Sequence, residues 1–172
     1  MGASLRQLWS DRRGAAAAEM ALVAPLLIAL MFGSLELGKF FLDEHVVIKA
    51  VRDGARFAAR QGFTTMPCGG TATNEAQIKN LVRYGKVVVA SGDKPRLPYW
   101  TSPATITITI NCYDNSGVDG ARIYGGIYAE RPTVPKVTVS ASVPYRPLAG
   151  AFGFNGIGLS LNASNQASVS GI

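Results

Sequence analysis

The stretch that decides the fold is RRGAAAAEMALVAPLLIALMF, residues 12–32. Two arginines and a glycine come first, four alanines separate Gly14 from Glu19, and an uncharged apolar run begins directly after that carboxylate. Positive charge before an apolar run keeps that end of a membrane segment in the cytoplasm. An ordinary amphipathic helix does not need a lone glutamate at the start of a hydrophobic segment. The stretch therefore predicts a membrane helix with a distinct signal in front of it.

The length of the apolar run favours a spanning helix. Glu19 and Glu36 bracket the uncharged residues 20–35 and would lie about 25 Å apart at about 1.5 Å per residue. This is slightly less than the hydrocarbon core of a bilayer, so both carboxylates are expected near opposite interfaces, where a charge costs less than at the centre. Pro25 removes one backbone donor and is expected to kink the helix. Membrane helices also tolerate proline, so a functional hinge and a tolerated proline both remain open.

The helix is expected to continue beyond the membrane. Residues 42–60 place apolar side chains at helical spacing, and Gly62 is a candidate stop. Charged residues fall mainly on the other face: Lys49, Arg52, Asp53, Arg56 and Arg60. One helix over residues 15–61 would be about 70 Å long, with a membrane-spanning first half and an amphipathic second half. The second half can cover its own domain, and part of that face can also contact neighbouring subunits.

The remainder predicts a small α+β domain. Residues 74–89 have a helical pattern with Asn74 as a candidate N-cap. Strict alternation with β-branched residues predicts strands over residues 105–110 and 136–143, and residues 159–169 give a third, weaker strand. Such alternation is typical of an antiparallel sheet with one buried face. The amphipathic half of the long helix is the natural cover for that face, which is a pilin-like arrangement.

Two other export signals fit the N-terminus less well. A secretory signal needs a small-residue cleavage site after its apolar core, and residues 32–37 offer none. A twin-arginine signal needs apolar residues soon after the arginines, whereas glycine and alanines follow here. The two remaining alternatives are an uncleaved membrane anchor and a prepilin-like segment.

Two motifs carry a resemblance to a known family. RGAAAAEMALVAPLL (residues 13–27) and, downstream, AVRDGARFAAR (residues 50–60) resemble the TadE-like family, the minor pseudopilins of bacterial tight adherence (Flp/Tad) pilus systems. The resemblance covers roughly residues 12–62. One departure is Met20, which stands where an aromatic residue commonly follows the glutamate of the family.

The resemblance implies a processing site and a role in assembly. Glycine, a four-residue spacer and a glutamate form the layout that a prepilin peptidase recognises, which implies cleavage between Gly14 and Ala15 with Glu19 as the recognition and assembly residue. The implied partners are the inner membrane, the peptidase, and other pilins or pseudopilins with their assembly machinery. The rival hypothesis is an uncleaved single-pass anchor that displays a periplasmic binding domain.

These expectations divide the chain into four parts. Residues 1–14 form a basic leader, 15–42 a transmembrane segment, 43–62 its amphipathic continuation, and 63–172 an extracytoplasmic α+β domain. We expect a single-pass protein of the bacterial inner membrane with a cytoplasmic N-terminus and a periplasmic C-terminal domain. Because the periplasm oxidises thiols, Cys68 and Cys112 are expected to form a disulfide; the alternative is two free buried thiols.

Composition argues against several other functions. The net charge is +6, but the basic residues form no run interleaved with aromatics, so no nucleic-acid binding is expected. The single histidine, His45, and two distant cysteines give no zinc motif, and residues 114–120 lack the ligand spacing of an EF-hand, so no metal is expected. Because no catalytic motif is present, we expect no enzymatic activity, no cofactor and no small-molecule substrate.

Overall fold

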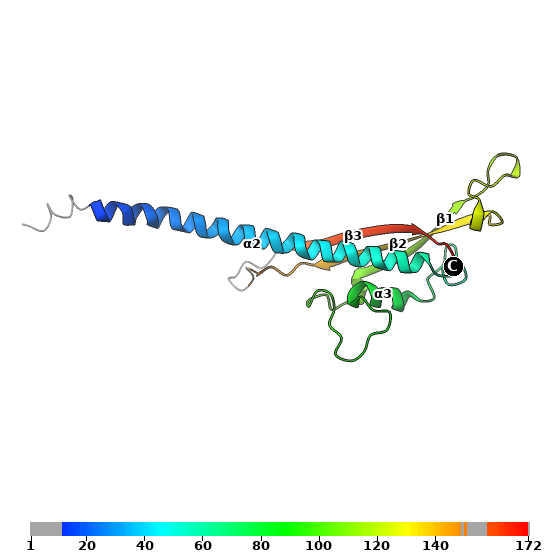
Figure 1. Ribbon diagram of the computed structural model, residues 1–172, viewed down its shortest axis with the longest axis horizontal. Coiled ribbons are helices and arrows are strands. Elements are labelled where there is room, and N and C mark those ends of the chain that lie inside the picture. The colour runs from blue at the N-terminus through cyan, green and yellow to red at the C-terminus, as the bar shows by residue number, and fades with distance from the viewer. Residues whose placement is uncertain (1–11, 149, 151–157, 172) are drawn as a thin grey trace, which may run out of the picture.

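The computed structural model describes residues 12–148, 150 and 158–171. The long helix α2 spans Arg12–Ala59 and projects far beyond a compact body made of a short helix and a three-stranded sheet (Figure 1). The expected α+β class, with a long N-terminal helix packed on an antiparallel sheet, is confirmed. Residues 1–11 of the expected leader lie outside the described residues.

The sheet is an antiparallel meander. Strands β1 (Ile106–Asp114), β2 (Thr133–Pro144) and β3 (Ser160–Ser168) lie in the order β1-β2-β3. The register places Ile108 opposite Val139 and Val139 opposite Asn165. Alternating residues of β2, including Val137, Val139 and Val143, are fully buried. All three predicted strands are present, and β1 and β2 extend several residues beyond the predicted limits.

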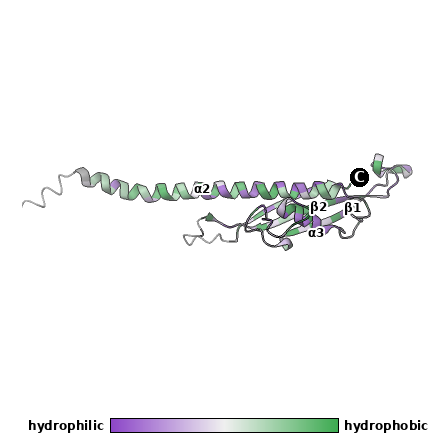
Figure 2. Cartoon of the chain, turned by 60° about the horizontal axis from the view of Figure 1, so that its bottom comes forward, coloured by the Kyte–Doolittle hydropathy of each residue, from purple (hydrophilic) through white to green (hydrophobic). Residues whose placement is uncertain are grey.

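The core forms where α2, α3 and the sheet meet. Helix α3 (Glu75–Tyr84) packs against the second half of α2, which itself lies over β3 and β2 (Figure 2). Gly54 allows the closest approach, because a Cβ there would lie 2.4 Å from Val82 of α3 and 3.6 Å from Val139 of β2. The amphipathic second half of the predicted helix therefore does cover the sheet.

Two predicted helix ends are wrong in detail. Helix α3 ends at Tyr84 rather than at residue 89, because Gly85 adopts a left-handed conformation (φ 74°) and its N–H bonds to the carbonyl of Leu81. Helix α2 ends at Ala59, before the expected stop at Gly62, as the N–H of Arg60 bonds to Phe57 in a tightened last turn.

The predicted capping residue of α3 lies in the expected place without making the expected bond. Asn74 is the N-cap residue, but its side chain accepts no hydrogen bond from the first turn. Its backbone φ/ψ of −105°/29° is not the extended conformation that directs a cap side chain back to the helix. The N-terminus of α3 therefore depends on backbone bonds to the Asn74 carbonyl, from the N–H groups of Gln77 and Ile78.

Candidate assembly and processing site

The first half of α2 is an apolar helix whose side chains are mostly exposed. From Gly14 to Leu35 nearly every side chain is exposed, with Leu22 at 80% and Leu27 at 54% exposure. Among the described residues, one helix is long and apolar enough to cross a membrane, and none of its apolar window is buried inside the protein. We call residues 14–35 the apolar half of α2 and residues 43–59 its packed half. The apolar half is consistent with membrane anchoring.

The expected processing residues lie at the start of the apolar half of α2. Gly14 is in the first turn of α2, and a Cβ placed on it would meet nothing within 4 Å. Ala15 follows it in the helix. Glu19 is exposed and lies about 7.5 Å from Gly14 along the helix axis. The first backbone N–H groups of a helix have no intrahelical partners, so this end is the easiest part of α2 to unwind. The peptide bond between Gly14 and Ala15 is thus accessible.

Helix α2 continues without interruption through Pro25. Because proline has no N–H, the carbonyl of Ala21 lacks its usual donor four residues later. The kink expected at this position stays a prediction.

A cluster of polar and aromatic side chains surrounds α2 where the helix enters the domain. The Glu36 carboxylate accepts hydrogen bonds from the Tyr145 hydroxyl and from the backbone N–H of Leu148, the latter at 2.9 Å. Four residues later on the same face, Phe40 contacts the Tyr145 ring edge to face, with centroids 5.1 Å apart. These contacts fix the loop after β2 against the helix, more than 100 residues away in sequence.

The next turn of the helix continues the cluster. Lys39 pairs with Asp43 at 2.5 Å, donates to the carbonyl of Arg146 at 3.1 Å, and lies over the Tyr99 and Tyr145 rings. The Tyr99 hydroxyl donates to Asp43 at 2.7 Å. We call Glu36, Lys39, Asp43, Tyr99 and Tyr145 the junction cluster. Tyrosines and a lysine at the end of an apolar helix are typical of a membrane–water interface.

Both tyrosines of the junction cluster are held in the protonated form. Burial raises the pKa of Tyr99, and its hydrogen bond to Asp43 raises it further. Burial likewise raises the pKa of Tyr145, with a second contribution from its hydrogen bond to Glu36. Each tyrosine therefore remains a hydrogen-bond donor to its carboxylate at physiological pH.

The domain is also held by the expected disulfide. Cys68, in the loop after α2, is bonded to Cys112 on β1, with the two Cα atoms 5.4 Å apart and a sequence separation of 44. This confirms the pairing and excludes two free thiols. The bond ties the end of the long helix to the edge of the sheet.

Sequence reasoning treated Glu36 only as a boundary charge and did not identify the rest of the junction cluster. Its members come from α2 and from two loops that are 56 and 109 residues away in sequence. The available signal was local: Lys39 and Asp43 at a spacing of four residues predict a helical ion pair. Their tyrosine partners follow only from the tertiary fold.

The fold defines a pilin-like architecture, and the exposed apolar half of α2 is consistent with membrane anchoring. A family model described as TadE-like protein matches residues 14–56, so the TadE-like resemblance is confirmed over the apolar half and most of the packed half of α2. The match associates the chain with proteins of the Tad pilus. Neither a curated protein nor a solved structure shows significant similarity to the chain.

Proposed function

We propose that this protein is a minor pseudopilin of a tight adherence pilus, which acts by packing its apolar helix against those of other pilin subunits. The observation that carries the proposal is the contrast within α2: one half is buried against the sheet, whereas large apolar side chains of the other half, such as Leu22 and Leu27, are exposed among the described residues. In a membrane that surface is covered by lipid, and in a filament by neighbouring helices. The same surface can thus serve as an anchor before assembly and as an interface afterwards.

The proposal includes cleavage by a prepilin peptidase between Gly14 and Ala15. A protease must hold extended backbone closely at the scissile bond, and Gly14 offers the least steric obstruction. The cut would leave a new ammonium on Ala15, four residues before Glu19 and one helical turn from its carboxylate. An unpaired ammonium in an apolar helix bundle is strongly unfavourable, and a nearby carboxylate offsets much of that penalty.

Processing can be tested on the protein coexpressed with its own prepilin peptidase. N-terminal sequencing of the membrane-extracted protein should begin at Ala15. Gly14→Val should leave the full precursor, whereas Gly33→Val is a matched control because a Cβ at either glycine meets nothing within 4 Å. If the wild type retains residues 1–14, the pseudopilin hypothesis is wrong and the protein is an uncleaved membrane anchor.

Glu19 is proposed to act in assembly rather than in cutting, since it lies beyond the scissile bond. Glu19→Ala should be processed normally and should copurify poorly with the coexpressed pilin subunits. Glu19→Asp, which keeps the charge, should recover part of that copurification. Equal copurification of Glu19→Ala and the wild type would contradict an assembly role for the carboxylate.

The proposed orientation places the sheet domain in the periplasm. Alkaline phosphatase fused after Arg60 should be active, because this enzyme requires an oxidising compartment for its own disulfides. Green fluorescence from a fluorescent protein fused at the same position would instead indicate a cytoplasmic domain.

A further inference from the structure

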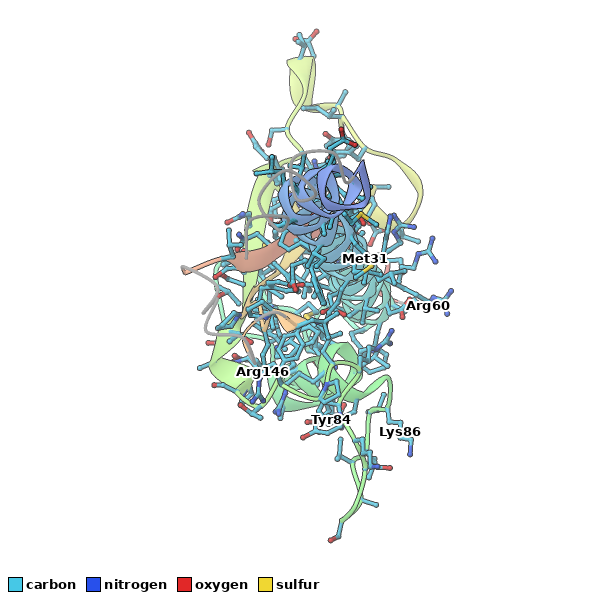
Figure 3. The ribbon with its side chains drawn as sticks, turned by 90° about the vertical axis from the view of Figure 1, so that its left-hand side faces the viewer. Met31, Arg60, Tyr84, Lys86 and Arg146 are labelled. Carbon is cyan, nitrogen blue, oxygen red and sulfur yellow. A yellow bond between two sulfur atoms is a disulfide. The ribbon has the colours of Figure 1, made fainter. Side chains whose placement is uncertain are left out.

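A row of cations follows the outward face of the packed half of α2 and ends one residue beyond the helix. Lys49, Arg52, Arg56 and Arg60 are all exposed and follow one another at intervals of three, four and four residues. Residues at these intervals are neighbours on one face of a helix. We call these four residues the basic stripe. Figure 3 shows Arg60 at its end, directed away from the sheet.

No carboxylate of the described residues pairs with the basic stripe. Asp53 is the single carboxylate between residues 45 and 60, and it pairs instead with Arg96 in the loop after α3, at 2.9 Å. Within the part of the chain that the structure describes, none of the four cations takes part in an ion pair. Four adjacent positive charges are thus available to a partner.

The basic stripe is continuous with the exposed apolar surface. Val47, Ala50 and Val51 of the packed half are fully buried toward the sheet, and the stripe lies on the opposite side of the same helix. Continued toward the N-terminus, that side carries Phe41 and Leu27, both half exposed. A helix that packs along the apolar half on this side will therefore meet the stripe next.

A second copy of this chain is a poor occupant for the stripe. Two copies that meet through this face would bring like charges together, and like-charge juxtaposition across an interface strongly disfavours association. A lipid surface fits poorly as well, because the stripe rises about 16 Å along the helix axis from Lys49 to Arg60. This exceeds the Debye length of about 8 Å at physiological salt, so the far end lies beyond the reach of anionic headgroups.

We propose that the basic stripe docks on an acidic helix face of a different pilin subunit, which selects a hetero-partner over a second copy of this chain. This inference rests on the proposed role in pilus assembly and adds the chemistry of the partner. The apolar half provides adhesion with little discrimination, since residues 20–35 carry no charged side chain. Charge complementarity along the stripe provides the specificity and the register.

Photo-crosslinking in cells that coexpress the pilin subunits tests the proposal on the full-length protein. One variant carries Ile48→p-benzoylphenylalanine, beside the stripe, and a second carries Leu27→p-benzoylphenylalanine in the apolar half. Position 48 should crosslink to a different pilin subunit, and the crosslinked peptide should contain two or more carboxylates on one helical face. Position 27 should crosslink to a pilin subunit as well.

Charge variants then test the cause of the crosslink. Arg52→Glu with Arg56→Glu should lower the yield at position 48 by about tenfold, because it places like charges against the acidic face. Arg52→Lys with Arg56→Lys should keep most of the yield. A control with the same change in net charge, Lys94→Glu with Arg122→Glu, alters exposed cations away from α2 and should leave the yield unchanged. Formation of the Cys68–Cys112 disulfide in every variant checks that the domain has folded.

The two crosslinking positions separate failure of this inference from failure of the proposed function. Crosslinks at position 27 without a subunit crosslink at position 48 would overturn the inference and leave the pseudopilin proposal intact. Crosslinking of position 48 to a second copy or to lipid, or a yield that charge reversal does not change, would also overturn it. Absence of subunit crosslinks at both positions would contradict the proposed function itself, and the inference with it.

Discussion

The two halves of α2 share one helical backbone conformation, but the packed half is buried against the domain and the apolar half is exposed. In the packed half, small residues such as Ala50, Gly54 and Ala58 let the helix approach the sheet and α3 closely. In the apolar half, large side chains such as Leu22 and Leu27 are exposed among the described residues, at 80% and 54%. Figure 2 shows the difference as a helix whose one half lies on the body and whose other half projects freely. Stability is therefore expected to reside in the packed half, and association in the apolar half.

Removal of the disulfide should have the largest effect on the packed half. Because the two cysteines have a sequence separation of 44, Cys68→Ser with Cys112→Ser is expected to lower the free energy of unfolding by about 4 kcal/mol in the chain-entropy model. Urea unfolding of the full-length protein in detergent, with and without reductant, measures this loss. The wild type in reductant should behave as the double variant does. An unchanged unfolding midpoint would show that the bond adds nothing to the stability of the domain.

A glycine-to-alanine pair compares the two halves directly. Gly54→Ala places a methyl group 2.4 Å from Val82, so neighbouring side chains must move and the free energy of unfolding should fall by about 1–3 kcal/mol. Gly33→Ala in the apolar half meets nothing within 4 Å. Since alanine favours helix over glycine, that variant should lose no stability. Thermal unfolding of both proteins in the same detergent provides the comparison, and equal shifts would contradict it.

The packed half and the sheet could be predicted from sequence because their signals are periodic and local. Helical spacing of apolar residues identified the buried face of α2, and alternation identified β1, β2 and β3 within a few residues of their ends. The disulfide followed from the number of cysteines and the expected compartment. Helix ends were less accurate because they depend on single backbone conformations, such as the left-handed Gly85.

The junction cluster could not be predicted, because it is built from contacts across the fold. No local pattern around Tyr145 indicates its place beside Glu36, which depends on how β2 lies along the helix. Asn115 gives a second example. Its fully buried side chain donates to the carbonyls of Tyr124 and Tyr128 and organises the loop between β1 and β2, a role that no pattern in residues 114–120 indicates.

The junction cluster separates the two halves, and its tyrosines predict a dependence on alkaline pH. Tyr145→Phe removes the donor to Glu36 and should cost about 1 kcal/mol at neutral pH. The pKa of Tyr145 is raised in the folded protein above its ordinary value of about 10. Because the unfolded chain loses this proton first, the stabilising contribution is complete below about pH 10 and is lost as the pH rises further.

Urea unfolding between pH 7 and pH 11 measures this effect. Above pH 10 the wild type should lose stability more steeply than Tyr145→Phe, so that the two curves converge. Tyr113→Phe is the control, since Tyr113 is exposed and its hydroxyl has no hydrogen bond to other described residues. Parallel curves for the wild type and Tyr145→Phe would show that the Tyr145 proton does not contribute.

The smallest effect on stability is expected from the apolar half itself. Leu27→Ala removes a large side chain that is 54% exposed, so the free energy of unfolding should change by less than about 0.5 kcal/mol. Leu161→Ala, in a fully buried position on β3, should cost about 2–5 kcal/mol. The same leucine-to-alanine change thus has opposite consequences in the two regions.

Leu27→Ala should instead reduce copurification with other pilin subunits, because helix contacts within a membrane depend on side-chain packing. Unfolding in detergent and copurification from membranes, measured on both variants, give the comparison. Should Leu27→Ala destabilise the domain as much as Leu161→Ala does, the two halves of α2 would not be independent, and the apolar half would have a structural role within its own chain.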